Sequence, residues 1–314
     1  MHASIHNAPA HEQLEYFVRM AETTPPMPTA VVHPVDPNSL EGAIEAAKHN
    51  LIEPVLVGPA HKIEACAKQL GLDLSPYRLI DVEHSHAAAA MSCQLVRKGE
   101  VQALMKGGIS SDEFLSAVMD KEAGIRTARR LSHVFVLDVP LYHKPLFITD
   151  AAINIAPDLS AKRDILQNTI DFCQRLGIQT PKVGILAAIE KVNARMPSTL
   201  DAAALCKMAD RGQIQGAILD GPLAFDNAIS AEAARDKHIE SPVAGDVDIL
   251  LAPDLEAANM LGKQLIYLSG AKSAGLVLGA RVPLILTSRA EKTLGRLASC
   301  ALAALFMHPK QDEE

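Results

Sequence analysis

The sequence of 314 residues predicts an α/β protein built from two domains. The first observation behind this prediction is a repeated pattern in which short apolar runs, glycine-containing turns and amphipathic segments follow one another. That pattern is typical of parallel strands joined by crossover helices. The second observation is that this series stops near residue 130 and a new one begins after residue 149. Hydrophobic residues make up 48% and charged residues 21%, which indicates a globular chain.

The N-terminal half contains the first series. Buried runs rich in β-branched residues predict four strands, and the segments between them have the apolar spacing of helices. We expect strands at 29–36, 55–58, 78–83 and 101–107, and helices at 11–22, 40–50, 61–71, 86–100 and 110–120.

The second series starts with two runs, 133–140 and 144–155, that a short polar turn connects, so we expect an antiparallel pair. Strand-like runs and helices then alternate again: we expect a long helix at 159–177, strands at 182–189, 215–220, 247–254 and 276–286, and a last helix at 290–307. We place the boundary at Thr149 and expect the last helix to return to the first domain. The predicted domains are 1–148 plus 290–314, and 149–289.

The formal net charge of −7, the pI near 5.9 and the absence of Trp argue against sequence-independent nucleic-acid binding, which needs a basic surface and stacking aromatics. No apolar run is long enough to span a membrane, and the N-terminus lacks the pattern of a signal peptide. The five cysteines show no CxxC spacing, so we expect reduced, mostly buried thiols in a cytoplasmic protein. The histidines do not cluster as metal ligands, so we predict no metal.

Several polar groups fall where predicted strands end, which is the edge where open α/β sheets bind ligands. The turn after residue 105 offers Lys106, Gly107 and the hydroxyls of Ser110 and Ser111 to an anion; a plain turn with Ser110 as helix cap is equally consistent. Three carboxylates also lie at strand ends: Asp150, Asp220 and Asp254. Each is consistent with a ligand contact, a general base or an ordinary turn residue.

The stretch from Ser269 to Glu291 contains the last two groups of candidates. Its loop with Ser269, Gly270 and Lys272 lacks the spacing of a nucleoside triphosphate loop, and the apolar run 276–286 reads as one strand that ends at Ser288 and Arg289. A guanidinium there suits a phosphate or carboxylate. Read locally, Ser288 equally suits a helix N-cap beside an exposed Arg289.

An ordered series of motifs, LMKGGISS, RTARRLSHV, FITDAAINIAPDLSAKRDIL, ILDGPLAFDNAIS, DILLAPDLEAANMLGKQL and SGAKSAGLVLGARVPLILTSRAE, resembles the phosphate acetyl/butyryltransferase family over residues 30–307. The resemblance implies two three-layer α/β/α domains with an interdomain cleft, the layout that isocitrate and isopropylmalate dehydrogenases share. It also implies a homodimer that moves a short acyl group reversibly between coenzyme A and orthophosphate. Coenzyme A and phosphate are then substrates, with no tightly bound cofactor and no metal.

The resemblance also implies roles for single residues. By the match of motif, Ser288 donates to the developing oxyanion and Arg289 holds the phosphate. From their position at strand ends and in the loop 269–272, we also expect the following residues to contact substrate: Lys106, Gly107, Ser110, Ser111, Asp150, Asp220, Ser269, Gly270 and Lys272. Acetyl-specific members carry an aspartate, the proposed base, seven residues after the serine, where this chain has Gly295. Glu291 is the nearest carboxylate and is our candidate base; a carboxylate in the first turn of a helix is the simpler reading.

A second departure concerns a cation. The acetyl branch places an arginine in the helix after the lysine-glycine turn, where this chain has Ala117, so Arg126, Arg129 or Arg130 is expected to replace it. Three functions therefore stay open at this point. They are a phosphate acyltransferase of unassigned chain-length preference, a catalytically inactive binding or regulatory homologue, and a metal-dependent dehydrogenase of similar layout.

Overall fold

The structure is a computed structural model, and it describes residues 11–286 and 293–308. The chain forms two compact units. The N-terminal unit comprises residues 14–129 and 274–309, and the central unit comprises 1–13, 130–273 and 310–314. The predicted α/β class is confirmed. The predicted domain ranges, divided at 148/149 and 289/290, differ from these limits and stay a prediction.

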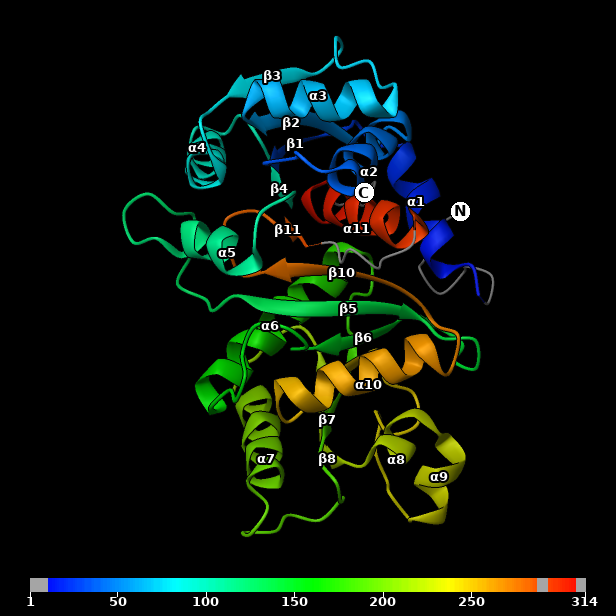
Figure 1. Ribbon diagram of the computed structural model, residues 1–314. Coiled ribbons are helices and arrows are strands. Elements are labelled where there is room, and N and C mark those ends of the chain that lie inside the picture. The colour runs from blue at the N-terminus through cyan, green and yellow to red at the C-terminus, as the bar shows by residue number, and fades with distance from the viewer. Residues whose placement is uncertain (1–10, 287–292, 309–314) are drawn as a thin grey trace, which may run out of the picture. The chain divides into compact units, whose positions relative to one another are not determined.

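The sheet of the N-terminal unit has the strand order β3-β2-β1-β4-β11-β10 (Figure 1). All neighbouring pairs are parallel except β11 with β10. The strands are β1 (Met27–Val32), β2 (Ile52–Gly58), β3 (Arg78–Asp81), β4 (Ala103–Lys106), β10 (Lys272–Leu278) and β11 (Leu284–Ile285).

The strand order of this unit reverses between β1 and β4. The chain proceeds from β1 to β2 and β3 on one side, then crosses back to β4 on the other side of β1. Because parallel crossovers are right-handed, helices on the two sides of this reversal cover opposite faces of the sheet. Accordingly, α2 contacts α3 and α11, whereas α4 contacts α5. The helices are α1 (Gln13–Glu22), α2 (Pro37–Lys48), α3 (Ala60–Leu70), α4 (Ser85–Arg97), α5 (Ser111–Met119) and α11 (Thr293–Met307).

The central unit has the strand order β5-β6-β9-β7-β8. As predicted, β5 and β6 form an antiparallel pair, and the remaining pairs are parallel. α10 lies along β5 and β6 (Figure 1), and α6 contacts the same two strands and α7. The elements are β5 (Ser132–Asp138), β6 (Leu146–Thr149), β7 (Lys182–Leu186), β8 (Ile218–Leu223), β9 (Ile249–Leu251), α6 (Leu159–Arg175), α7 (Pro197–Asp210), α8 (Phe225–Ile229), α9 (Ala231–Asp236) and α10 (Leu255–Tyr267).

The structure corrects the prediction for the last strand. Residues 276–286 form the end of β10, a turn, and β11, in place of a single strand. Gly279 has φ +95°, a left-handed conformation that glycine adopts without steric cost, and Val277 pairs antiparallel with Leu284. The apolar run hid the turn because both strands of the hairpin are buried.

Candidate functional site

The switch point of the N-terminal unit is the edge where β1, β4 and β11 end side by side. Val32 pairs with Lys106, and Ile285 pairs with Met105, so all three strands stop within one residue of the same level. Ligands of open α/β sheets bind outside the carboxyl ends of the strands at such a reversal. The predicted Ser288, Arg289 and Glu291 lie outside the described residues. In the sequence, Ser288 follows Leu286 by two residues, a chain length of about 7 Å.

The turn after β4 is packed tightly against the end of β1. The amide of Gly107 donates to Val32 O at 2.9 Å, and the amide of Gly108 donates to His33 O at 2.8 Å. A Cβ atom at Gly107 would lie 2.4 Å from Val32 O, and one at Gly108 would lie 2.8 Å from a carboxylate oxygen of Asp36. The glycines are therefore required for close approach of two backbones. Their amides are already used inside the protein, which differs from the predicted anion cradle.

The same turn leads into α5. Ser110 Oγ accepts the amide of Glu113 at 3.1 Å, so the predicted helix cap is confirmed. Lys106 is half-buried, and its Nζ lies 3.4 Å from Gly107 O. Ser111 is exposed in the first turn of the helix. The proposed substrate contacts of Lys106, Ser110 and Ser111 stay predictions.

In the central unit, Asp150 occupies the end of β6 and is 2% exposed. Its Oδ1 accepts the amides of His133, Ala152 and Ile153 at 3.0–3.1 Å. Its Oδ2 accepts the amide of Asn154 at 3.0 Å and the side chain of Asn154 at 2.6 Å. Five donors fill most of the acceptor capacity of this carboxylate, so the structure gives Asp150 the role of a turn anchor. The substrate contact predicted for Asp150 remains untested.

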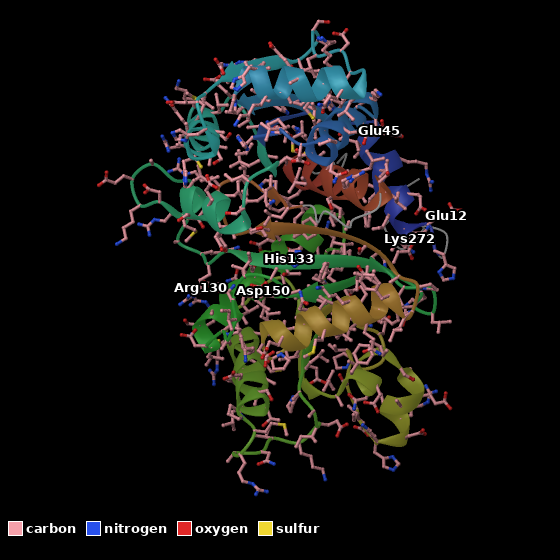
Figure 2. The ribbon with its side chains drawn as sticks, in the orientation of Figure 1. Glu12, Glu45, Arg130, His133, Asp150 and Lys272 are labelled. Carbon is pink, nitrogen blue, oxygen red and sulfur yellow. The ribbon has the colours of Figure 1, made fainter. Side chains whose placement is uncertain are left out.

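His133 lies beside Asp150 (Figure 2). The ring meets Phe135 edge to face at 4.6 Å, and its buried Nδ1 has no hydrogen-bond partner. Burial lowers the pKa of His133 from 6.5 to about 4, against a smaller opposing effect of the Asp150 charge. The imidazole is therefore neutral at pH 7.

The structure separates Asp220 from Asp150. Asp220 lies within β8, not at its end, because the strand continues through Gly221 to Leu223, which pairs with Leu186. Its Oδ1 accepts the amide of Gly221 at 2.8 Å. Two strands, β9 and β7, stand between β6 and β8, which corresponds to about 14 Å at a strand spacing of about 4.8 Å.

The loop with Ser269 and Gly270 follows the end of α10 and leads into β10, which begins at Lys272. Gly270 has φ +70°, and the amide of Ala271 donates to Leu265 O at 3.0 Å, as expected where a helix terminates. Lys272 Nζ donates to His11 O at 2.7 Å. The other end of α10 lies at the Asp150 turn, because Asn259 donates to Ala151 O at 3.1 Å. A helix of 13 residues is about 20 Å long, so this loop lies far from Asp150.

The sequence profile described as "Phosphate acetyl/butaryl transferase" matches residues 85–304. The chain belongs to this family. It is 57% identical over 290 residues to a phosphate acetyltransferase of Rhizobium meliloti, covering 92% of each chain. It is 42% identical over 291 residues to a phosphate butyryltransferase of Clostridium beijerinckii, covering 93% of this chain and 96% of the relative.

Among solved structures, a branched-chain phosphotransacylase from Enterococcus faecalis superposes with a TM-score of 0.77 at 28% identity, covering 90% of this chain and 99% of the other. The predicted family is thereby confirmed, and with it the prediction that the chain is an acyltransferase. The dehydrogenase reading is not supported.

The structure shows where the three arginines lie that were expected to replace the arginine of the acetyl branch. Arg126 forms a bridge with Ala280 in the turn between β10 and β11, at the edge where β4 begins. The structure therefore does not bring Arg126 to the Lys106 turn, which lies at the opposite edge. Arg129 and Arg130 are exposed, and the amide of Arg130 lies 3.3 Å from Asp164 Oδ2.

The described residues contain no group of three His, Cys, Asp or Glu side chains arranged to hold a metal. The five cysteines are free thiols and four are buried, as expected from their spacing. Burial raises the pKa of Cys93 to about 11 and that of Cys206 to about 12, which disfavours the nucleophilic thiolate. In residues 11–286 and 293–308, no helix is long and apolar enough to span a membrane.

The sequence reading missed one residue of the switch point, His33. It follows β1 directly, and its Nδ1 lies 2.9 Å from Gly108 O. A histidine-proline pair directly after the buried run 29–32 was the available signal, because it places a titratable side chain at a strand end.

Proposed function

We propose that the chain catalyses the reversible transfer of a short acyl group, acetyl or butyryl, between coenzyme A and orthophosphate. The products in one direction are acyl phosphate and free coenzyme A. The observation that carries the proposal is the arrangement of the N-terminal unit, in which β11 ends beside β4 at the switch point. In the sequence, the serine and arginine of the family motif follow β11 by three and four residues. We infer that both act at the edge where α/β sheets bind ligands.

The proposed roles follow from the charges of the reaction. Attack on the acyl carbonyl creates an oxyanion, which Ser288 stabilises as a hydrogen-bond donor. The phosphate carries negative charge in both directions, and the planar guanidinium of Arg289 binds it with two hydrogen bonds. Glu291 is a candidate for proton transfer. Lys106 contributes a further positive charge beside the same strand ends.

The proposal is tested by measuring phosphate-dependent release of thiol from acetyl-, propionyl- and butyryl-CoA. Comparison of the three initial rates gives the acyl preference. Arg289→Ala is expected to raise the KM for phosphate and to lower kcat, because it removes a contact that strengthens in the transition state. Full activity and unchanged phosphate affinity in this variant contradict the assigned role of Arg289, and absence of thiol release in the wild type contradicts the proposed function.

The alternative of an inactive acyl-CoA-binding homologue receives less support. It was motivated by Gly295 and Ala117, which replace two acetyl-branch residues, yet the chain is 57% identical to a curated phosphate acetyltransferase. Coenzyme A binding in calorimetry together with background thiol release is the result that would favour this alternative.

We further propose that the protein works as a cytoplasmic homodimer on small-molecule substrates, with no tightly bound cofactor. The central unit exposes three large apolar side chains, Leu141 at 97%, Tyr267 at 73% and Leu268 at 82%. A Cβ atom at Gly270 would lie 3.9 Å from Pro140 Cγ, so Leu141 lies near the end of α10. Exposed apolar clusters often mark protein interfaces. Tyr267→Lys is expected to shift the molar mass in light scattering from dimer towards monomer; an unchanged dimer excludes this surface.

A further inference from the structure

His33 is held in an uncommon backbone conformation at the centre of the switch point. Its φ of +57° lies in the left-handed region, which costs most residues about 1–2 kcal/mol. Three backbone hydrogen bonds fix it there: its amide donates to Val57 O at 2.7 Å, and its carbonyl accepts the amides of Val35 at 2.9 Å and Gly108 at 2.8 Å. Strained conformations that the surroundings over-determine occur preferentially at functional sites.

The imidazole ring is fixed on two edges by the strands on either side of β1. On the β4 side, Nδ1 lies 2.9 Å from Gly108 O. On the β2 side, a Cβ atom at Gly58 would lie 3.7 Å from Cδ2 of the ring. Two ring atoms, Nδ1 and Cδ2, thus lie against the ends of the neighbouring strands.

The contact with Gly108 also fixes the tautomer of His33. A carbonyl oxygen only accepts hydrogen bonds, so Nδ1 carries the proton and donates it to Gly108 O. In the neutral ring Nε2 is then an unprotonated acceptor. His33 is half-buried, and its Nε2 is neither enclosed nor hydrogen-bonded within the part of the chain described. A base oriented by a backbone hydrogen bond on its other nitrogen is a common catalytic arrangement.

We propose that His33 is the general base that activates coenzyme A, with Nε2 as the proton acceptor. The inference rests on the proposed function, and the observation behind it is independent of the family motif. Gly295 stands where a base is expected from the resemblance, and we assign that role to His33 in place of Glu291. His33 lies one residue beyond Val32, which pairs with Lys106, at the edge where β1, β4 and β11 end.

In the proposed reaction, His33 acts first on the thiol of coenzyme A. Nε2 takes the proton from the thiol, and the sulfur forms a bond to the acyl carbon of the acyl phosphate. The tetrahedral intermediate collapses with cleavage of the bond between the acyl carbon and the phosphate oxygen, and phosphate leaves. In the reverse direction phosphate attacks acyl-CoA, the bond from carbon to sulfur breaks, and the imidazolium returns its proton to the departing thiolate.

The decisive variant is His33→Asn. Asparagine tolerates the left-handed conformation, and its amide is able to donate to Gly108 O, so the turn stays braced while the base is removed. We expect kcat to fall about 10²- to 10⁴-fold in both directions, with each KM within about threefold of wild type. His61→Asn is the matched control, because His61 is exposed on α3 and should leave kcat unchanged.

A second variant distinguishes loss of the base from loss of folding or of turn geometry. His33→Gly keeps the backbone conformation and leaves a gap in which free imidazole can act as the base. Added imidazole should restore part of the lost kcat in His33→Gly and leave the kcat of His61→Asn unchanged. Nitrogen-15 spectra of the labelled histidines in the wild type give a readout besides activity: the signals lost in His33→Asn should show a protonated Nδ1 and an unprotonated Nε2.

The outcomes separate the two proposals. An active wild type with an unaffected kcat in His33→Asn, or with a loss confined to KM, overturns the role of His33 and leaves the acyltransferase function standing. A protonated Nε2 in the neutral ring also overturns it. A wild type without thiol release defeats the proposed function itself, whatever the tautomer of His33.

Discussion

A Cβ atom at Gly107 would lie 2.4 Å from the carbonyl oxygen of Val32, the oxygen that accepts the Gly107 amide at 2.9 Å. The atoms in conflict belong to the backbones of two neighbouring strand ends, so no side-chain rotation relieves the clash. Because His33 follows Val32, any displacement here also moves the imidazole and the turn that it contacts. The geometry of β1 and β4 thereby couples the stability of the unit to its proposed site.

Gly107→Ala is therefore expected to lower both stability and activity. The strand ends must separate by several tenths of an ångström or more, and overpacking of this kind costs about 1–3 kcal/mol. The free energy of unfolding in urea and kcat measure the two effects. Gly42→Ala is the matched control, since its Cβ would meet Arg296 Cδ at 3.4 Å, an ordinary contact, and alanine favours a helix interior by about 1 kcal/mol. Equal stability of the two variants contradicts the prediction.

Asp150→Asn is expected to destabilise the protein by about 2–4 kcal/mol, because the variant loses charge-assisted hydrogen bonds and turns an NH₂ group towards amide donors. Chemical denaturation measures this loss. Asp254→Asn provides the comparison: Asp254 caps α10 through the amide of Ala257 at 2.8 Å, and asparagine caps almost equally well. If Asp150→Asn instead raises a KM at unchanged stability, Asp150 is a substrate contact, as the sequence suggested.

Acid is expected to destabilise the protein through His133. The pKa of this residue is 6.5 in the unfolded chain and about 4 in the folded one, since burial disfavours the charged ring more than Asp150 favours it. Between these values the unfolded state binds the additional proton, so stability is complete above pH 6.5 and is lost as the pH falls towards 4. The full loss is about 3 kcal/mol. Unfolding measured from pH 7.5 to 4 should show this slope.

His133→Phe removes the titration and keeps an aromatic ring against Phe135. The variant should show a flatter stability profile between pH 6.5 and 4. Asp246 remains in it as a second acid-sensitive group: burial raises its pKa, but hydrogen bonds and charges from Lys182 and Lys144 outweigh burial and lower the pKa to about 2. An identical slope in both proteins would assign the acid sensitivity above pH 4 to other residues.

The sequence predicted most strands and helices because their signals are local. Periodicity located the antiparallel pair β5–β6, and the hydroxyl of Ser110 identified the start of α5. The same local reading failed at Gly279, where a hairpin interrupts an apolar run, and at Asp220, where a glycine-proline pair continues a strand. In both cases a neighbouring strand decides the conformation, and one sequence does not show which strands are neighbours.

For the candidate site, too, local signals could be read from the sequence and contacts between distant segments could not. Strand-end motifs located the Lys106 turn, but the strand order that places β1 between β2 and β4 depends on contacts distant in sequence. The histidine-proline pair marked His33 as a strand-end residue, but the sequence did not show that its ring lies near the ends of both neighbouring strands. Ser269 and Gly270 suit both a helix terminus and a phosphate loop, because the two use the same residue types, and their substrate contacts stay a prediction.

Ser288 has two readings that matched substitutions separate. As oxyanion donor it acts only in the transition state, so Ser288→Ala should lower kcat about 10²- to 10³-fold with little change in KM. As helix cap it contributes about 1 kcal/mol to stability, and glycine replaces that contribution to within a few tenths. Ser288→Gly should therefore keep the stability of the wild type and show the kcat of Ser288→Ala. If kcat in Ser288→Gly equals that of the wild type while Ser288→Ala only unfolds more easily, Ser288 is a cap and the oxyanion donor must be sought elsewhere at the switch point.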